Sequence, residues 1–147
     1  MKIIYWTLVI VLAGVFVGLS VCQPTILARK EFLKGFINQE VLSIMSVMMT
    51  ISITSIATIH IWFNELEDKH GKKVFGAARR EINQTAFYLV GLFVAQLACL
   101  IIRSMPIFSG NETSVSLFNG LSLILLLASV ISLLDIMGVV RALTPSD

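Results

Sequence analysis

The sequence predicts an all-α integral membrane protein with a single domain spanning residues 1–147. The first observation is composition: 56% of the 147 residues are apolar and 14% are charged, with a mean hydropathy of +0.89. Soluble domains are typically about 45 to 50% apolar and about 25% charged. The second observation is four long apolar runs, each close to the ~20 residues that cross a bilayer as a helix. These runs are Ile3 to Cys22, Val41 to Phe63, Ile82 to Ile102 and Thr113 to Leu134.

Lipid offers no hydrogen-bond partners to the backbone, so each run must satisfy its own amides as a helix. We expect a four-helix (tetraspan) bundle, with helices over about 3–22, 41–63 extending to about 70, 74–103, and 114–140. The first run could instead be a secretory signal. Its apolar stretch exceeds the 7 to 15 residues of a signal core, and Val21 breaks the small-residue pattern before a cut, which favours a retained helix.

The distribution of basic residues predicts the orientation, because Lys and Arg in short loops favour the cytoplasmic side. The N-terminus, central loop and tail hold seven (Lys2, Lys69, Lys72, Lys73, Arg79, Arg80, Arg141), against four in the other loops (Arg29, Lys30, Lys34, Arg103). We therefore expect both termini and the central loop in the cytoplasm. The first outer loop alternates apolar and charged residues over 25–38, which predicts an amphipathic connector in the headgroup plane.

Small residues at spacing four predict where helices approach closely. The first helix has Gly14 and Gly18, followed by Cys22, and the third has Gly91 and Ala95, followed by Cys99. These faces would pack within one chain or between copies, and a homo-oligomer is the expected assembly. For the two cysteines, unpaired thiols are favoured over a disulfide, since nothing in the sequence brings them close together.

A row of hydroxyls follows one face of the second helix. Its members recur at steps of three and four: Ser43, Ser46, Thr50, Thr54 and Thr58. Such a stripe could line a hydrated path for ions. Alternatively, each hydroxyl bonds a carbonyl of its own helix or of a neighbour and stabilises the bundle. Ser52 and Ser55 lie off the stripe, which favours the second interpretation.

Two ionisable residues lie near the predicted inner ends of the second and fourth helices. These are His60 and Asp135, at similar expected depth. Because imidazole titrates near neutrality, a contact between them could act as a pH-sensitive latch. The alternative places Asp135 in the headgroup layer and leaves His60 as an interfacial residue beside Trp62. The second is favoured, because burial costs less near the membrane edge.

The stretch "FNELEDKHGKKVFGAARREINQ" predicts a short helical hairpin that projects into the cytoplasm, acidic on the exit and basic on the return. Lys72, Lys73, Arg79 and Arg80 form its basic half. Such a group suits anionic inner-leaflet lipid. It also suits a soluble cytoplasmic partner, because charge complementarity gives specificity.

An enzyme is not predicted. Intramembrane catalysis needs convergent groups, whereas this chain has one membrane aspartate, one membrane histidine and no metal-binding spacing. No catalytic residue, metal, cofactor or nucleic-acid partner is expected. The remaining classes are a membrane sensor, anchor or effector subunit with a cytoplasmic partner, an autonomous ion-conducting pore, and a structural or accessory membrane subunit.

The arrangement resembles the small membrane subunits of bacterial phage-defence systems. The features that carry the resemblance are a charged first outer loop, a hydroxyl-bearing second helix entered through "EVLSIMSVMMT", and a basic central loop "KKVFGAARRE". The Kiwa membrane component and the Rex exclusion membrane protein are the two families with this plan. The resemblance implies an inner-membrane homo-oligomer that works with a cytoplasmic partner, sensing infection or breaching the membrane. It assigns no functional residues.

Overall fold

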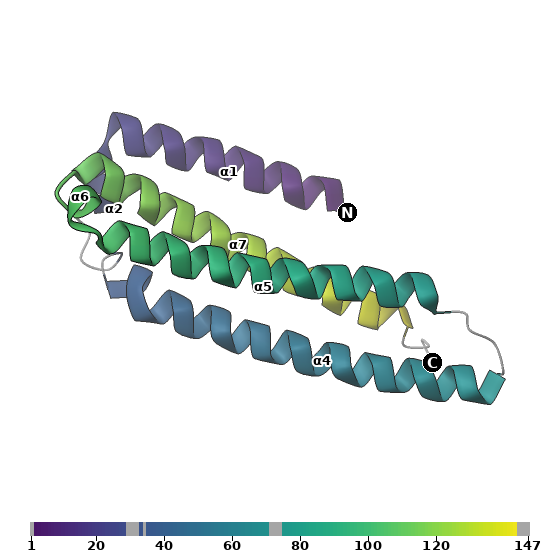
Figure 1. Cartoon of the computed structure of the whole chain (residues 1–147). Coiled ribbons are helices and arrows are strands. Elements are labelled where there is room, and N and C mark those ends of the chain that lie inside the picture. Colours follow the sequence, from purple (N-terminus) through teal and green to yellow (C-terminus); the bar gives the residue numbers. More distant parts are fainter. Residues whose placement is uncertain (1, 29–32, 34, 71–74, 144–147) are drawn as a thin grey trace.

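The protein, seen in a computed structural model, is described over residues 2–28, 33, 35–70 and 75–143, and every regular element in these ranges is helical. Four long helices lie side by side (Figure 1). They are α1 (Lys2–Cys22), α4 (Val41–His70), α5 (Gly76–Ser104) and α7 (Glu112–Leu143). Shorter elements join them: α2 (Pro24–Ala28), the π-helical turn η1 (Phe36–Glu40) and α6 (Pro106–Ser109).

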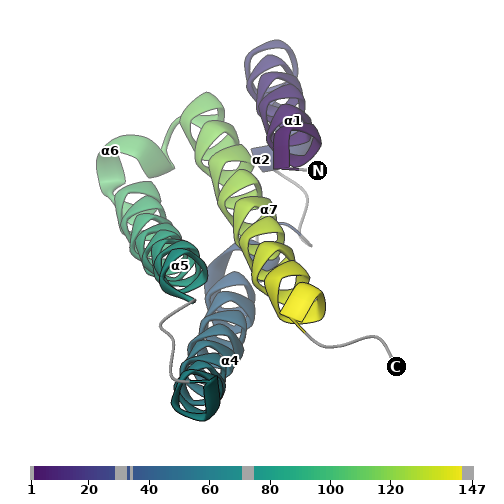
Figure 2. The same cartoon turned by 90° about the vertical axis from the view of Figure 1, so that its right-hand side faces the viewer.

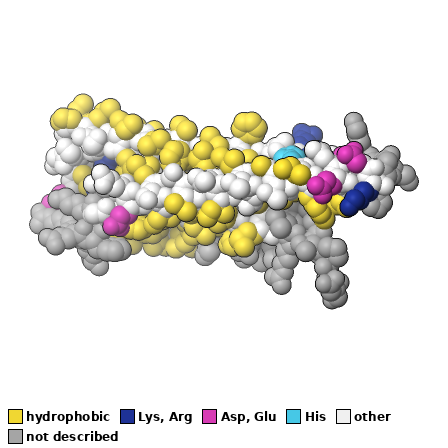
Figure 3. Space-filling model, turned by 90° about the horizontal axis from the view of Figure 1, so that it is seen from below, with side chains coloured by type: hydrophobic (Ala, Val, Ile, Leu, Met, Phe, Trp, Pro, Cys, Tyr) yellow, Lys and Arg dark blue, Asp and Glu magenta, His cyan; other side chains and the backbone are white. Residues whose placement is uncertain are grey.

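Three described segments are long and apolar enough to cross a membrane: Phe36–Lys69, Gly76–Ser104 and Glu112–Gly138. In α1 the apolar segment Val9–Cys22 is shorter. Charged side chains gather toward the two ends of the molecule, with uncharged side chains between them (Figure 3). The prediction of a helical, multi-pass membrane protein is thus confirmed. A fourth crossing by α1 and the orientation of the termini stay predictions.

Helix α7 is the centre of the bundle, because α1, α2, α4 and α5 all pack against it (Figure 2). In the apolar 18-residue stretch of α7, 39% of the residues are buried, against 22% in the corresponding stretch of Phe36–Lys69 and 17% in that of α5. Its buried face is rich in small polar residues: Ser116, Asn119, Ser122, Ser129 and Ser132. Small side chains allow close approach of helix backbones where lipid removes the hydrophobic drive.

The small residues predicted to mediate close helix packing are not at the helix contacts of the described chain. Gly14, Gly18, Gly91 and Ala95 are exposed on the single chain. A Cβ added to any of the three glycines would meet nothing within 4 Å. These residues therefore make no tight contact within the described part of the protomer, and their role between copies stays a prediction. The close approach occurs at Gly120 of α7, where a Cβ would lie 3.3 Å from the Cβ of Phe16.

The chain between α1 and α4 is folded into the bundle at its described residues. Leu27, Ala28 and Ile37 are buried. Ile37 has non-helical backbone angles (φ −82°, ψ 49°), which interrupt the hydrogen-bond ladder just before α4. Two side chains from other helices bond carbonyls of this stretch: Asn119 Nδ2 donates to Leu27 O at 2.6 Å, and Arg103 Nη1 donates to Ile37 O. The amphipathic connector in the headgroup plane stays a prediction, since residues 29–32 and 34 lie outside the described ranges.

Replacing Gly120 with valine should loosen the contact between α7 and α1, because the new side chain meets Phe16 and the Ser20 hydroxyl at short range. Overpacking of this kind costs about 1–3 kcal/mol. The measurement is unfolding by sodium dodecyl sulfate in mixed micelles, followed by far-ultraviolet circular dichroism. Gly18→Val is the matched control and should leave the unfolding midpoint of the monomer unchanged. Equal midpoints for Gly120→Val and wild type would contradict the packing.

Candidate functional site at the charged end of the bundle

Helix α4 is longer than the membrane requires. Its 30 residues extend about 45 Å at a rise of ~1.5 Å per residue, against a hydrocarbon core of ~30 Å. The final turns carry exposed charged side chains at Glu65, Asp68 and Lys69. We call residues 63–69 of α4, together with 75–81 at the start of α5, the charged end.

An aromatic stack forms the interior of the charged end. The Phe63 and Phe75 rings lie 4.7 Å apart between centroids at an interplanar angle of 9°. The Arg79 guanidinium carbon lies 5.7 Å from the Phe63 centroid, within the range of a cation–π interaction. Phe63 is fully buried and belongs to an apolar cluster that also contains Ile82 and Ile136. The stack thus joins the end of α4 to the start of α5.

Polar contacts fix the same junction. Arg79 Nη2 donates to Asn64 Oδ1 at 2.7 Å and to Glu67 Oε2 at 2.9 Å. The other oxygen of Glu67 accepts from the backbone N–H of Phe75 at 3.2 Å. The side chains of Arg79 and Glu67 are only 26% and 15% exposed. Partial burial and shared hydrogen bonds make this ion pair stronger than an isolated surface pair.

The four basic residues predicted to contact a partner or lipid have different environments. Arg79 is used inside the charged end, as described above. Arg80 is exposed, and within the described residues it forms no ion pair or hydrogen bond. Lys72 and Lys73 lie outside the described residues. Of the two members of this group that the structure describes, Arg79 and Arg80, the second is therefore the one available for an external ligand.

The two residues predicted to form a latch, His60 and Asp135, bond or face different residues. His60 Nε2 lies 2.9 Å from Asn83 Oδ1, a hydrogen bond between α4 and α5. Asp135 is half-buried on α7 and lines a groove with Arg80 of α5. No hydrogen bond or ion pair joins His60 to Asp135 among the described residues. His60 is thus bonded to Asn83, a contact that residue spacing alone does not indicate.

The hydroxyl stripe faces away from the rest of the chain. Ser43, Ser46, Thr50, Thr54 and Thr58 are all exposed on α4. The three threonines donate to the carbonyls four residues earlier, at 2.9, 2.9 and 3.0 Å. This bonding within one helix is what the second of the two sequence-based interpretations expects. A path lined by this stripe would have to lie between copies, because within one protomer the stripe lies on the outside.

Two amides lie in the interior of the bundle. Gln96 Nε2 donates to the Ser122 hydroxyl across α5 and α7, and Asn119 holds Leu27. Gln96 Oε1 and Asn119 Oδ1 are fully buried and find no hydrogen-bond partner in the part of the chain that the structure describes. Both cysteines are free thiols: Cys22 is exposed, and Cys99 is buried near the Phe118 carbonyl. The polar interior therefore connects helices.

Within the described residues no three His, Cys, Asp or Glu side chains converge on a point where they could hold a metal ion. Comparison of the chain with protein-family models, with curated proteins and with solved structures finds no match. The function is therefore inferred from the geometry of the charged end and of the exposed helix faces.

Replacing Arg79 with glutamine should loosen the charged end, because it removes the ion pair to Glu67 and the cation–π contact to Phe63. A charge-assisted hydrogen bond contributes about 1.5–3 kcal/mol, and partial exposure reduces the expected loss to about 1–2 kcal/mol. Amides over 64–70 and 76–82 should then exchange hydrogen about five- to thirty-fold faster. Exchange is measured by mass spectrometry in detergent micelles.

Arg80→Gln is the matched control, since the neighbouring arginine makes none of these contacts. Its exchange rates should equal those of wild type. If both variants exchange alike, Arg79 has no special role in holding α4 to α5.

Proposed function

We propose that the chain is a non-catalytic subunit of the bacterial inner membrane, which assembles with copies of itself and holds a soluble partner at its charged end. In this proposal the charged end lies in the cytoplasm, as the Lys and Arg distribution predicts. The resemblance to phage-defence subunits suggests the setting, in which the partner acts after infection is sensed at the membrane.

The observation that carries the proposal is the ordered contact set at the charged end. Phe63, Phe75, Glu67 and Arg79 hold the ends of two helices together beyond the apolar segment. A surface that is already ordered loses less conformational entropy when a partner binds. The contacts use Arg79 and Glu67 internally and leave exposed charges around them, at Glu65, Asp68, Lys69 and Arg80.

Mixed charges on a rigid surface suit a protein partner. Complementary positive and negative groups steer encounter and reject wrong partners. A surface meant only for anionic lipid needs basic residues alone, whereas this one presents Glu65 and Asp68 beside Lys69. Docking of a soluble protein therefore explains the acidic half as well as the basic half.

A pore formed between copies is the second candidate. The exposed hydroxyl stripe on α4 favours it, because a stripe that is outside one protomer could line a channel enclosed by several. The threonine hydroxyls already donate to carbonyls of their own helix, so the stripe needs no water-filled path to satisfy its protons. We rank this candidate second for that reason.

The orientation can be tested with two cysteine substitutions in a Cys22→Ser, Cys99→Ser background. Gly76 and Gly110 are both exposed, lie at opposite ends of the bundle, and have open space around a new Cβ. An impermeant maleimide added to intact spheroplasts should label Gly110→Cys and spare Gly76→Cys, which should react only after lysis. The reverse labelling pattern would put the charged end outside and overturn the proposal.

The choice between docking and pore can be tested by phage plating in a sensitive bacterium that expresses the chain with its neighbouring genes. Wild type should lower plaque counts. Glu65→Lys with Asp68→Lys should abolish protection, because it reverses two exposed charges of the docking surface. Thr50→Leu with Thr54→Leu should keep protection.

The opposite result, with protection lost only in the threonine variant, would favour the pore. Membrane abundance of both variants is compared by immunoblot, since all four positions are exposed and should tolerate substitution. Plaque counts that are equal with and without wild type, across a broad panel of phages, would overturn the defence setting.

A further inference from the structure

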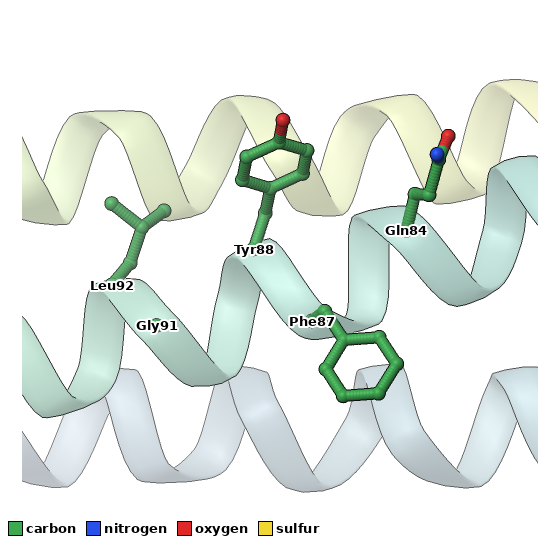
Figure 4. A pocket seen from close by; sticks show the side chains of 5 residues that line it. All are labelled: Gln84, Phe87, Tyr88, Gly91 and Leu92. Carbon is green, nitrogen blue, oxygen red and sulfur yellow. The ribbon is translucent and has the colours of Figure 1, made fainter.

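Two adjoining hollows follow one face of α5. The first has a volume of about 410 Å³ and is lined by Gln84, Phe87, Tyr88, Gly91 and Leu92 (Figure 4). The second, of about 580 Å³, lies between α5 and α7 nearer the charged end. Gln84, Tyr88 and Leu92 line both. The two hollows therefore adjoin along this row of residues, and we call them together the α5 groove.

The two halves of the α5 groove differ in chemistry. Near the charged end it is lined by Arg80 and Glu81 of α5 and by Asp135 of α7. Farther along, it is bordered by the exposed rings of Phe87 and Tyr88, with Gly91 leaving a notch between them and Leu92 (Figure 4). The α5 groove thus has a charged half near the charged end and an apolar half farther along the outer surface of α5.

The length of the groove matches one leaflet of a bilayer. Arg80, Gln84, Tyr88 and Leu92 recur at steps of four, so they lie along a single face of α5. From Arg80 to Leu92 the helix rises about 18 Å at ~1.5 Å per residue. Half of a ~30 Å hydrocarbon core is about 15 Å. A headgroup at the charged half and an acyl chain in the apolar half would therefore fit together.

Two of the charges that line the charged half of the groove, Arg80 and Asp135, lack a partner in the described part of the chain. Within the described residues neither Arg80 nor Asp135 forms an ion pair or a hydrogen bond, although both line the same hollow. Ionised side chains at a membrane edge are costly unless they are hydrated or paired. A ligand that carries one negative and one positive group would complement both at once.

We propose that the α5 groove binds a zwitterionic phospholipid with a primary ammonium, of the phosphatidylethanolamine class. Its phosphate accepts hydrogen bonds from the Arg80 guanidinium, which matches phosphate geometry. Its ammonium donates to the Asp135 carboxylate on the α7 side of the groove. One acyl chain lies over Gly91, between the rings of Phe87 and Tyr88.

Other membrane lipids fit less well. An anionic headgroup such as phosphatidylglycerol could bind Arg80 but would leave Asp135 unpaired and repelled. Phosphatidylcholine carries both charges, yet its trimethylated ammonium has no N–H to donate to a carboxylate. The preference for a primary ammonium is therefore assigned to Asp135, and the affinity common to all phospholipids is assigned to Arg80 and the apolar half.

The test is lipid binding to the full chain in detergent, measured by native mass spectrometry with synthetic 16:0–18:1 phosphatidylethanolamine, phosphatidylcholine and phosphatidylglycerol. Wild type should retain the ethanolamine lipid about two- to fivefold more than the other two, the ratio expected of one partly exposed ion pair. Asp135→Asn should remove this preference, and Asp135→Glu should keep it. Arg80→Gln should weaken binding of all three lipids.

Gly91→Leu should fill the apolar half and weaken binding of all three lipids, and it should fold because Gly91 has open space around it. Glu40→Gln, at an exposed position outside the groove, is the matched control and should bind like wild type. Equal retention of the three lipids by wild type, or an unchanged ethanolamine preference in Asp135→Asn, would overturn the proposal. Disulfide cross-linking of Gly91→Cys between copies in native membranes would also overturn it, by making the groove an interface.

Discussion

Every backbone amide and carbonyl of this chain that lies in lipid needs a hydrogen-bond partner, and this requirement governs the bundle. Long helices meet it internally. The chain between α1 and α4 does not do so throughout, because regular helix stops at Gln23 and is interrupted at Ile37. The carbonyls of Leu27 and Ile37 are satisfied by Asn119 and Arg103, which come from α7 and α5. Two side chains distant in sequence therefore hold Leu27 and Ile37, and with Ile37 the start of α4, against the bundle.

The same requirement separates the interior from the surface. Polar side chains that join helices, such as Gln96, Ser122 and Asn119, gather on α7 and its neighbours. The hydroxyls of α4 are exposed but bond back to their own helix, so they cost little in contact with lipid. Charges with defined partners lie at the charged end, where Arg79 and Glu67 join α4 to α5. Helix α4 therefore carries exposed hydroxyls along its apolar part and a fixed junction with α5 at the charged end.

Composition and run length were enough to predict a helical, multi-pass membrane protein, because the bilayer restricts backbone structure so strongly. Side-chain partners were harder to predict. Arg79 and Arg80 are adjacent in sequence, yet about 100° of helical rotation sends only the first toward Phe63. Glycine spacing drew attention to Gly14 and Gly91, which are exposed, whereas the contact lies at Gly120. The repeated serines of α7 indicate that this helix packs closely against others, but their spacing does not reveal that it will be the central helix.

The first helix of the chain packs mainly on the last. Helix α1 contacts α7 and α2, whereas α4 and α5 pack with each other and with α7. A ribosome adds about 5–20 residues per second, so α1 is complete several seconds before Glu112 and the rest of α7 are made. Until then its exposed glycines, valines and isoleucines can meet only lipid or other proteins. Completion of the bundle therefore waits for the end of synthesis, because the helix that covers α1 is the last one made.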